Sequence, residues 1–310
     1  MARKRRANGR DVNGILLLDK PVGMTSNAAL QTVKRLFNAN KAGHTGNLDP
    51  MASGLLPLCL GEATKVSGYL LDSDKHYLGT CKLGERTNSG DADGEVIETR
   101  AVKSYDNARI LSIFEKFTGE ISQIPPMHSA IKVNGQPLYK LAHRGIEIER
   151  KSRQVVIHQL KLLEQRPDEL DIEVHCSKGT YIRTLVEDIG TELGCGAHLK
   201  ALRRTGAGVF SIEYAVTLTE LEELAKGASE NGFSAMDELL MPMEQALADW
   251  PSVSLSENSS YYLRKGQAVQ VPQAPTDGWV CLFTEDARFL GIGQILGDGR
   301  VAPRRLINQP

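Results

Sequence analysis

The segment Lys41-Ala-Gly-His-Thr-Gly-Asn-Leu-Asp-Pro50 places one carboxylate, Asp49, after two glycines and a histidine and directly before a proline. Gly43 and Gly46 can adopt backbone conformations that are closed to other residues. Pro50 restricts the residue before it to an extended conformation. The segment therefore predicts a shaped loop that presents an acid. An ordinary turn uses the same residue types, so the surrounding sequence must decide between a functional loop and a plain turn.

Strands and helices are expected around this loop, out of strict alternation. Apolar residues alternate with polar ones where a half-buried strand is expected, and they recur three or four positions apart where a helix is expected. The expected strands cover residues 14–19, 77–83 and 170–176, and the expected helices cover about 25–37, 107–118 and 182–193. This mixture predicts the α+β class, with a mixed, mainly antiparallel central sheet and flanking helices.

The composition shifts near Trp250. Beyond it, strand-like runs at residues 279–283 and 289–295 are followed by turns, and no helix pattern is evident. We therefore expect a small all-β domain at residues 250–310 and a larger domain at 11–249. A length of 310 residues suits two domains.

The overall composition is that of a soluble globular protein, with 41% hydrophobic and 24% charged residues. No apolar run approaches the ~20 residues of a membrane helix, and the basic first residues lack the apolar core of a secretory signal. The five cysteines are scattered without a Cys-x-x-Cys pair, so the sequence suggests neither a zinc site nor a disulfide framework. A cytoplasmic location is expected.

The charge is unevenly distributed. The chain carries −1, while its first ten residues hold five basic groups and no acid, so the remainder carries −6. Any positive surface for RNA must therefore be local. The basic tail of residues 1–10 is one candidate, and it could equally be a disordered, solvated end.

Residues 124–153 are a second candidate for a positive surface. The segment combines glycines and the pair Pro125-Pro126 with six basic residues against Glu147 and Glu149, which indicates either an insertion that folds over RNA or a solvated hairpin. The excess of positive charge favours RNA. The basic residues are Lys132, Lys140, Arg144, Arg150, Lys151 and Arg153.

Residues 43–50 resemble the catalytic-loop signature of the bacterial tRNA pseudouridine synthase B family. Further segments are similar to that family and come in its order, so the resemblance runs from about residue 10 to the end of the chain. They are Gly14-Ile-Leu-Leu-Leu-Asp-Lys-Pro21, Lys75-His-Tyr77, Ile124-Pro-Pro-Met-His-Ser129 and Lys178-Gly-Thr-Tyr-Ile-Arg-Thr184. The resemblance implies an enzyme that isomerises the T-loop uridine of tRNA (position 55 in tRNA numbering), and a C-terminal RNA-binding domain of the PUA type.

The implied reaction breaks the bond from ribose C1′ to uracil N1, turns the base and joins C1′ to C5. Asp49 would either add to C1′ as a nucleophile or remove the 2′ proton as a base. Both roles need an ionised carboxylate, and a buried carboxylate stays ionised only with a positive partner or hydrogen bonds. The resemblance places Arg183 there. Spacing alone favours a surface ion pair from Arg183 to Glu187, one helical turn on.

The resemblance also assigns a pocket for the flipped base. In this implied pocket, Tyr77 stacks on the base and removes the C5 proton. Tyr181 closes over the base, Leu202 forms an apolar wall, Lys20 lies near the acid, and His44 fills the space that the uridine leaves. The ordinary alternatives are a packing tyrosine, a turn lysine and a hydrogen-bonding loop histidine.

The expected partner is the T-arm stem-loop of tRNA, bound by a monomer without guide RNA. Two alternatives stay open: a non-catalytic tRNA-binding or tRNA-folding protein, and a guide-RNA-dependent synthase. No metal and no organic cofactor are expected. The acidic run Asp91-Ala-Asp-Gly-Glu95 lacks the spaced ligands of a calcium loop, and it is expected to be a mobile turn.

Overall fold

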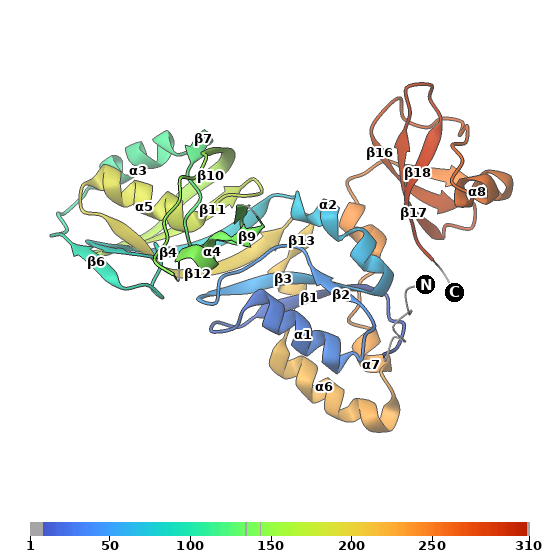
Figure 1. Cartoon of the computed structure of the whole chain (residues 1–310), viewed down its shortest axis with the longest axis horizontal. Helices are drawn as coiled ribbons and strands as arrows, with labels where there is room; N and C mark the ends of the chain where they lie inside the picture. Colours follow the sequence, from blue (N-terminus) through green and yellow to red (C-terminus); the bar gives the residue numbers. More distant parts are fainter. Residues whose placement is uncertain (1–8, 134, 143, 309–310) are drawn as a thin grey trace.

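The computed structural model describes residues 9–133, 135–142 and 144–308 (Figure 1). The predicted basic tail lies outside the described residues except for Gly9 and Arg10. Arg10 is anchored: its guanidinium donates to both carboxylate oxygens of Asp237, its Nε donates to the carbonyl of Phe37, and its Cζ lies 4.0 Å from the ring centre of Phe233.

A mixed central sheet of ten strands organises the main body, as the sequence predicts. Two neighbouring pairs, β1 with β14 and β3 with β12, are parallel, and the other pairs are antiparallel. The strand order is β14 (Val216–Thr217), β1 (Gly14–Lys20), β3 (Ala52–Leu60), β12 (Ala197–Ala207), β4 (Lys75–Leu83), β11 (Glu169–Cys176), β10 (Arg153–Arg166) and β7 (Gly119–Gln123), with β2 (Ala42–His44) on β3 and β13 (Phe210–Ser211) on β12.

The helices expected from periodicity are present. In α1 (Ser26–Leu36), the side chain of Thr25 caps the helix by accepting from the amide of Ala28 at 3.1 Å. The helix α5 (Ile182–Leu193) ends at Gly194, whose φ of 85° allows the left-handed C-cap. Both helices bury an apolar face against the sheet, together with α3 (Asn107–Lys116). A further long helix, α6 (Leu218–Asn231), begins at a capping box of Thr217 and Glu220.

The C-terminal part is built on a second, four-stranded sheet, which confirms the predicted β domain. Its strands are β15 (Ser252–Leu255), β16 (Trp279–Thr284), β17 (Phe289–Ile295) and β18 (Val301–Leu306). The expectation of no helix in this region is wrong: α8 (Glu257–Arg264) begins at a Ser256 cap and buries Ser260 and Leu263. Because only these two of its residues are buried, the helix has no apolar stripe for the sequence to reveal.

The two parts share a continuous core. Cys281, Phe289 and Ile292 of the C-terminal sheet lie in one buried cluster with Ile15 and Leu17 of β1. Two polar contacts tie their edges: the Lys65 ammonium donates to the Leu306 carbonyl at 2.7 Å, and the Asn308 amide donates to Glu62 at 2.6 Å.

The segment at 124–153 leaves the sheet between β7 and β10. It forms a two-stranded ribbon of β8 (Lys132–Val133) and β9 (Gln136–Pro137) followed by α4 (Leu138–Ala142), shown in green in Figure 1. Ser129 and Leu138 are buried, so the base of the segment is packed against the body. None of the helices in the described part of the chain is long and apolar enough to cross a membrane.

Candidate active site

The loop that carries Asp49 is held in shape by main-chain contacts. The Ser26 hydroxyl accepts from the Leu48 amide at 2.7 Å and donates to the Leu48 carbonyl at 3.0 Å. The Thr45 amide donates to the Pro57 carbonyl at 3.2 Å. Gly46 has a φ of 133°, which side-chain-bearing residues rarely adopt. The predicted shaped loop is therefore present, and α1 and β3 fix it from two sides.

Asp49, Arg183 and Asp91 form a line of alternating charges. The Nη2 of Arg183 lies 3.1 Å from Asp49 Oδ2, and its Nη1 lies 3.2 Å from Asp91 Oδ2. The side chains of Arg183 and Asp91 are 5% and 6% exposed, whereas that of Asp49 is 40% exposed. Asp49 is thus the open end of a network whose other members are buried.

Each terminal nitrogen of the Arg183 guanidinium makes two polar contacts. Besides the two carboxylates, it donates to the carbonyl of Ser89 at 3.1 Å and to that of His128 at 2.7 Å. Among the described residues, no ion pair joins Arg183 to Glu187, so the alternative that spacing favoured does not occur. The expected partner of Asp49 is in place, and the segment that starts at residue 124 contributes to holding it.

Asp91 is a site residue that the sequence did not reveal, and the expectation of a mobile acidic turn is wrong. The hydroxyl of Ser89 donates to Asp91 Oδ1 at 2.5 Å, and that of Thr87 donates to the Asp91 carbonyl at 2.7 Å. The turn is anchored because its carboxylate is buried against Arg183.

The environment disfavours charge on Asp49. Burial raises its pKa above the ordinary value, the charge of Arg183 opposes this rise, and Asp91 and Asp93 add to it. Lys20 also lowers the pKa of Asp49. Arg183 and Lys20 therefore favour the ionised carboxylate and oppose the effect of burial.

Lys20 lies at the end of β1 and is fully buried. Its ammonium donates to the carbonyls of Pro21 at 2.8 Å and Met24 at 2.7 Å. Burial lowers its pKa to about 8, against the raising effect of Asp49. A lysine with this pKa is still mainly charged at pH 7, so it can act as the second cation near the acid.

Tyr77 lies on β4, opposite Arg204 of β12 in the sheet. Burial raises the pKa of the Tyr77 phenol, and the neighbouring Arg204 opposes the rise. Arg204 is itself 1% exposed; its Nε donates to the Leu55 carbonyl at 2.7 Å and its Nη1 to the Asn47 carbonyl at 3.4 Å. This buried cation links Tyr77 to the Asp49 loop. It is a second site residue that the sequence did not reveal.

The remaining predicted pocket residues lie around the same loop. Tyr181 is the N-cap residue of α5, and its main chain exchanges hydrogen bonds with the Gln123 side chain at 3.0 and 3.3 Å. Leu202 lies on β12 between Gly79 and Ala52 of the adjacent strands. His44 ends β2, and burial lowers the pKa of its ring, which favours the neutral form.

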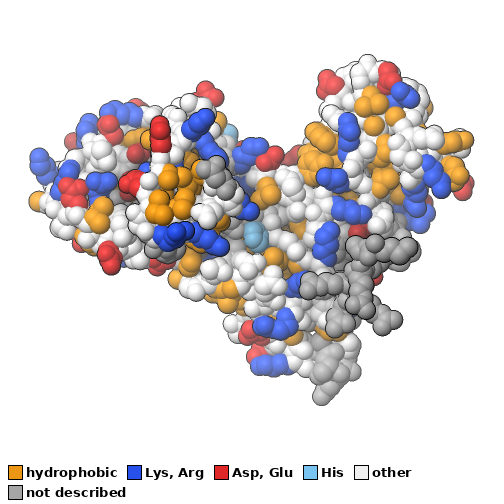
Figure 2. Space-filling view, in the orientation of Figure 1, with side chains coloured by type: hydrophobic (Ala, Val, Ile, Leu, Met, Phe, Trp, Pro, Cys, Tyr) orange, Lys and Arg blue, Asp and Glu red, His pale blue; other side chains and the backbone are white. Residues whose placement is uncertain are grey.

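The predicted RNA-binding residues Lys132, Lys140 and Arg144 lie apart from this site, exposed on the segment at 124–153. A second positive surface lies between the body and the C-terminal sheet. It is a groove of about 650 Å³, and Figure 2 shows Lys and Arg side chains along the hollow between the two parts. Its lining residues are Lys41, Thr64, Lys65, Gly68, Tyr69, Asp72, Arg304, Arg305 and Leu306.

Three family models match nearly the whole chain. Residues 34–182 match the N-terminal domain of the TruB family of pseudouridylate synthases. Residues 183–248 match the tRNA pseudouridylate synthase B C-terminal domain, and residues 251–307 match the C-terminal model of pseudouridine synthase II TruB.

Curated relatives and solved structures agree with the family models. A tRNA pseudouridine synthase B of Nitrosococcus oceani is 57% identical over 307 residues, covering 99% of this chain and 98% of the relative. One of Pseudomonas putida is 57% identical over 298 residues, with 96% of each covered. Chains from an H/ACA RNP bound to a substrate RNA containing 2′-deoxyuridine and from a Cbf5-Nop10-Gar1 complex have TM-scores of 0.74 and 0.73. They are 25% and 27% identical, covering 96% of this chain and 85% and 84% of theirs.

Proposed function

This chain belongs to the TruB family of pseudouridylate synthases, and from that premise we propose that it isomerises uridine 55 in the T-loop of tRNA. The chain is an isomerase that makes pseudouridine in tRNA. One observation carries the proposal for its chemistry. Asp49 is the only member of the Asp49–Arg183–Asp91 line that is open to solvent, and it pairs with a guanidinium that two main-chain carbonyls and Asp91 also hold.

In the proposed reaction, the uridine leaves its loop and enters the site at Asp49, at a cost of roughly a few kcal/mol for unstacking. The C1′–N1 bond breaks and the C1′–C5 bond forms. The proton at C5 is lost and one is gained at N1, so the atoms of substrate and product are the same. Asp49 assists the cleavage either as nucleophile at C1′ or as base at the 2′ position. Arg183 holds the carboxylate through a charge-assisted hydrogen bond.

The other residues take roles that fit their positions. Tyr77 stacks on the detached base and removes the C5 proton, with Arg204 beside its phenol. Tyr181 and Leu202 close the pocket, and Lys20 adds positive charge near Asp49. His44 fills the vacated place in the T-loop, because a neutral ring stacks without carrying charge into the RNA.

Recognition of the T-arm is assigned to the segment at 124–153. It reaches the site through the His128 carbonyl, and it displays Lys132, Lys140 and Arg144 to solvent. A chain whose own exposed basic segment contacts the site through His128 is suited to bind tRNA as a monomer, without guide RNA. This favours the proposal over the alternative of a guide-dependent synthase. The intact line from Asp49 to Asp91 favours it over a non-catalytic RNA-binding protein.

The proposal is tested with the purified full-length chain and a T-arm stem-loop that carries tritium at C5 of the target uridine. We expect stoichiometric tritium release, and pseudouridine at that position alone by mass-resolved mapping, with or without excess chelator. A stem-loop with cytidine at the target position is the matched control. No release from the stem-loop, or release only when a guide RNA is added, would overturn the proposal.

RNA binding by the segment at 124–153 is tested by replacing Lys132, Lys140 and Arg144 with Ala. Each lost phosphate contact removes ~0.7 to ~0.9 from the slope of log affinity against log salt, so the slope should flatten by roughly two units. Turnover at saturating tRNA should fall less than affinity does, because the Asp49 site is untouched. An unchanged slope would assign tRNA binding to another surface, with the groove between the two parts as the next candidate.

A further inference from the structure

A cluster of histidines and one carboxylate lies outside the site described above. The Nε2 of His158 lies 3.0 Å from Asp74 Oδ2, and the Nε2 of His175 lies 3.9 Å from the same oxygen. One nitrogen of each histidine and one oxygen of Asp74 lie within 4.8 Å of one another. His76 stacks on His175 with ring centres 3.9 Å apart and planes 11° apart.

The fold brings these side chains together from three strand regions. His76 and His175 are direct cross-strand partners in β4 and β11. His158 is the extra residue of a β-bulge in β10, since Ile157 pairs with Cys176 and Gln159 with His175. A bulge redirects a side chain, and here Ile157 is buried while His158 is on the exposed side. Because Ile157 pairs with the buried Cys176, the next residue, His158, lies on the same face as His175.

The turn that carries Asp74 is fixed by a buried lysine. The ammonium of Lys75 donates to the carbonyls of Leu70, Leu71 and Ser73, and the carbonyl of Asp74 accepts from the Gly208 amide at 2.9 Å. The carboxylate is thus presented from a rigid turn.

The plane of the His175 ring is fixed by its neighbours. His76 stacks on it, and the ring of His158 lies 4.7 Å away, centre to centre, at an angle of 43°. Histidine nitrogens are common zinc ligands, and these two histidines are already positioned beside the Asp74 carboxylate.

We propose that Asp74, His158 and His175 bind one first-row transition-metal ion, with Zn²⁺ the best match. Two imidazoles and one carboxylate suit zinc and exclude Mg²⁺ and Ca²⁺ as preferred ions, since those require oxygen ligands. Ligands at ~2.0 Å from a tetrahedral zinc lie ~3.3 Å from one another, close to the two distances to Asp74. The three ligand atoms lie within 4.8 Å of one another, so they would draw closer around the ion, and the fourth position is left for water.

The site is separate from the proposed reaction. His76 and Tyr77 are consecutive in β4, so their side chains point to opposite faces of the sheet. The ion binds on the open face, away from Asp49. No sequence pattern indicates such a site, because its ligands are far apart along the chain, with none of the short spacings that mark zinc motifs.

The test is a calorimetric titration of the full-length chain, freed of metal by chelator, with Zn²⁺. We expect one ion per chain with a Kd at or below about 10 µM, and visible absorption of a tetrahedral ion when Co²⁺ is used instead. His158→Gln and Asp74→Asn should each weaken Zn²⁺ binding at least ~100-fold. His76→Gln should weaken it ~10-fold, since an outer partner contributes less than a ligand.

Asp72→Asn is the matched control, because Asp72 lies in the same turn but pairs with Lys178 at 2.9 Å, outside the cluster. It should bind Zn²⁺ as the parent does. Two ligand variants are used so that the test still holds if one of them fails to fold. Circular dichroism checks the folding of each variant. Absence of stoichiometric binding by the parent, or equal binding by the parent and both ligand variants, would overturn the proposal.

Discussion

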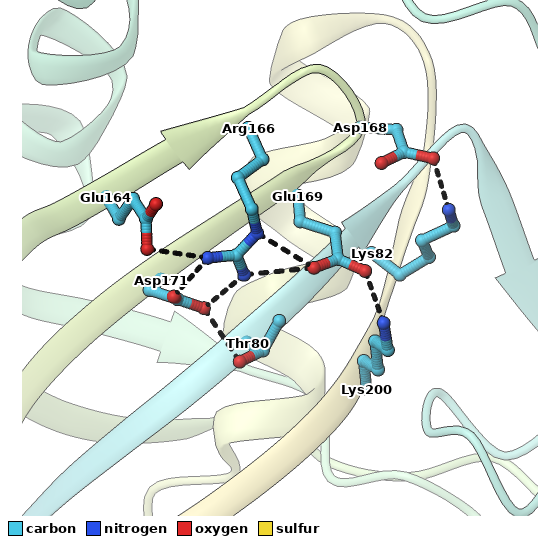
Figure 3. Close-up of polar contacts among 8 residues, drawn as sticks. All are labelled: Thr80, Lys82, Glu164, Arg166, Asp168, Glu169, Asp171 and Lys200. Carbon is cyan, nitrogen blue, oxygen red and sulfur yellow. Dashed lines mark hydrogen bonds and ion pairs between the residues drawn. The ribbon is translucent and has the colours of Figure 1, made fainter.

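Two arginines in this chain each form ion pairs with two or more carboxylates. One of the arginines is buried and the other is partly exposed. Arg183 is 5% exposed and lies 3.1 Å from Asp49 and 3.2 Å from Asp91. Arg166 is 34% exposed and lies among Glu164, Glu169 and Asp171 at 2.7 to 2.9 Å, on the face of β4, β10, β11 and β12 (Figure 3). The distances are similar, and the clearest difference between the networks is the burial of the central arginine.

The same kind of ion pair has opposite effects on the acids. Around Arg166, hydrogen bonding lowers the pKa of Asp171, through Arg166 itself, and that of Glu169, first through Lys200 and then Arg166. Around Arg183, burial raises the pKa of Asp49 although the guanidinium opposes it. Desolvation therefore decides the sign. The network around Arg183 holds a carboxylate whose charged form is disfavoured, and the network around Arg166 joins neighbouring strands.

The largest expected effect comes from Asp49→Asn. The change removes the charge at C1′ and little contact area, so pseudouridine formation should fall by at least ~10³-fold while tRNA binding stays within about tenfold. Because the ionised form is disfavoured in the folded chain, the variant should unfold at the same temperature as the parent or higher. Tritium release and thermal unfolding measure the two effects. Activity within tenfold of the parent would remove Asp49 from the mechanism.

Arg183→Gln should reduce both activity and stability. The buried Asp91 loses its cation, and removing one partner of a buried pair typically costs about 3 kcal/mol or more. We expect a Tm lower by roughly 6 °C and a rate lower by ~10²-fold, since Asp49 loses its positioning contact. A variant with the Tm of the parent would show that the buried Arg183–Asp91 pair does not stabilise the fold as expected.

Asp91→Asn should shift the pH dependence more than the maximal rate. Asp91 raises the pKa of Asp49, so its neutralisation lets that pKa fall. Activity needs ionised Asp49 and is lost as pH drops through its pKa, so the acid limb of kcat/KM should move to lower pH. Asp93→Asn is the matched control, because Asp93 acts on Asp49 in the same direction but makes no ion pair with Arg183. The acid limb should shift less for Asp93→Asn than for Asp91→Asn. A larger shift for Asp93→Asn would contradict the conclusion that Asp91 has the stronger effect on the pKa of Asp49.

Much of this fold was predictable because local patterns decide it. Alternation and helical spacing located β11 and α5, and a capping threonine located the start of α1. The glycines and Pro50 predicted a shaped loop at Asp49, whereas the role of Asp49 was implied only by the family resemblance.

What the sequence could not supply were contacts made by the fold itself. Asp91 meets Arg183, and Arg204 meets Asn47, only because strands far apart in the chain are neighbours in the sheet. A buried arginine looks like any other arginine in a strand until its partners are known. The residues implied by resemblance, such as Tyr77, were identified without any local signal of their own.

The smallest effect is expected at the exposed network, from Arg166→Gln. Asp171 and Glu169 have folded-state pKa values below their unfolded ones, so their contribution is present above about pH 4.3 and is lost as pH falls through the lowered values. At pH 7 the Tm should fall by less than about 2 °C, because solvent screens exposed pairs. The difference between variant and parent should shrink in high salt and vanish in acid. A loss as large as that of Arg183→Gln, or one independent of salt, would mean that the charges themselves stabilise both networks and that burial is not what separates them.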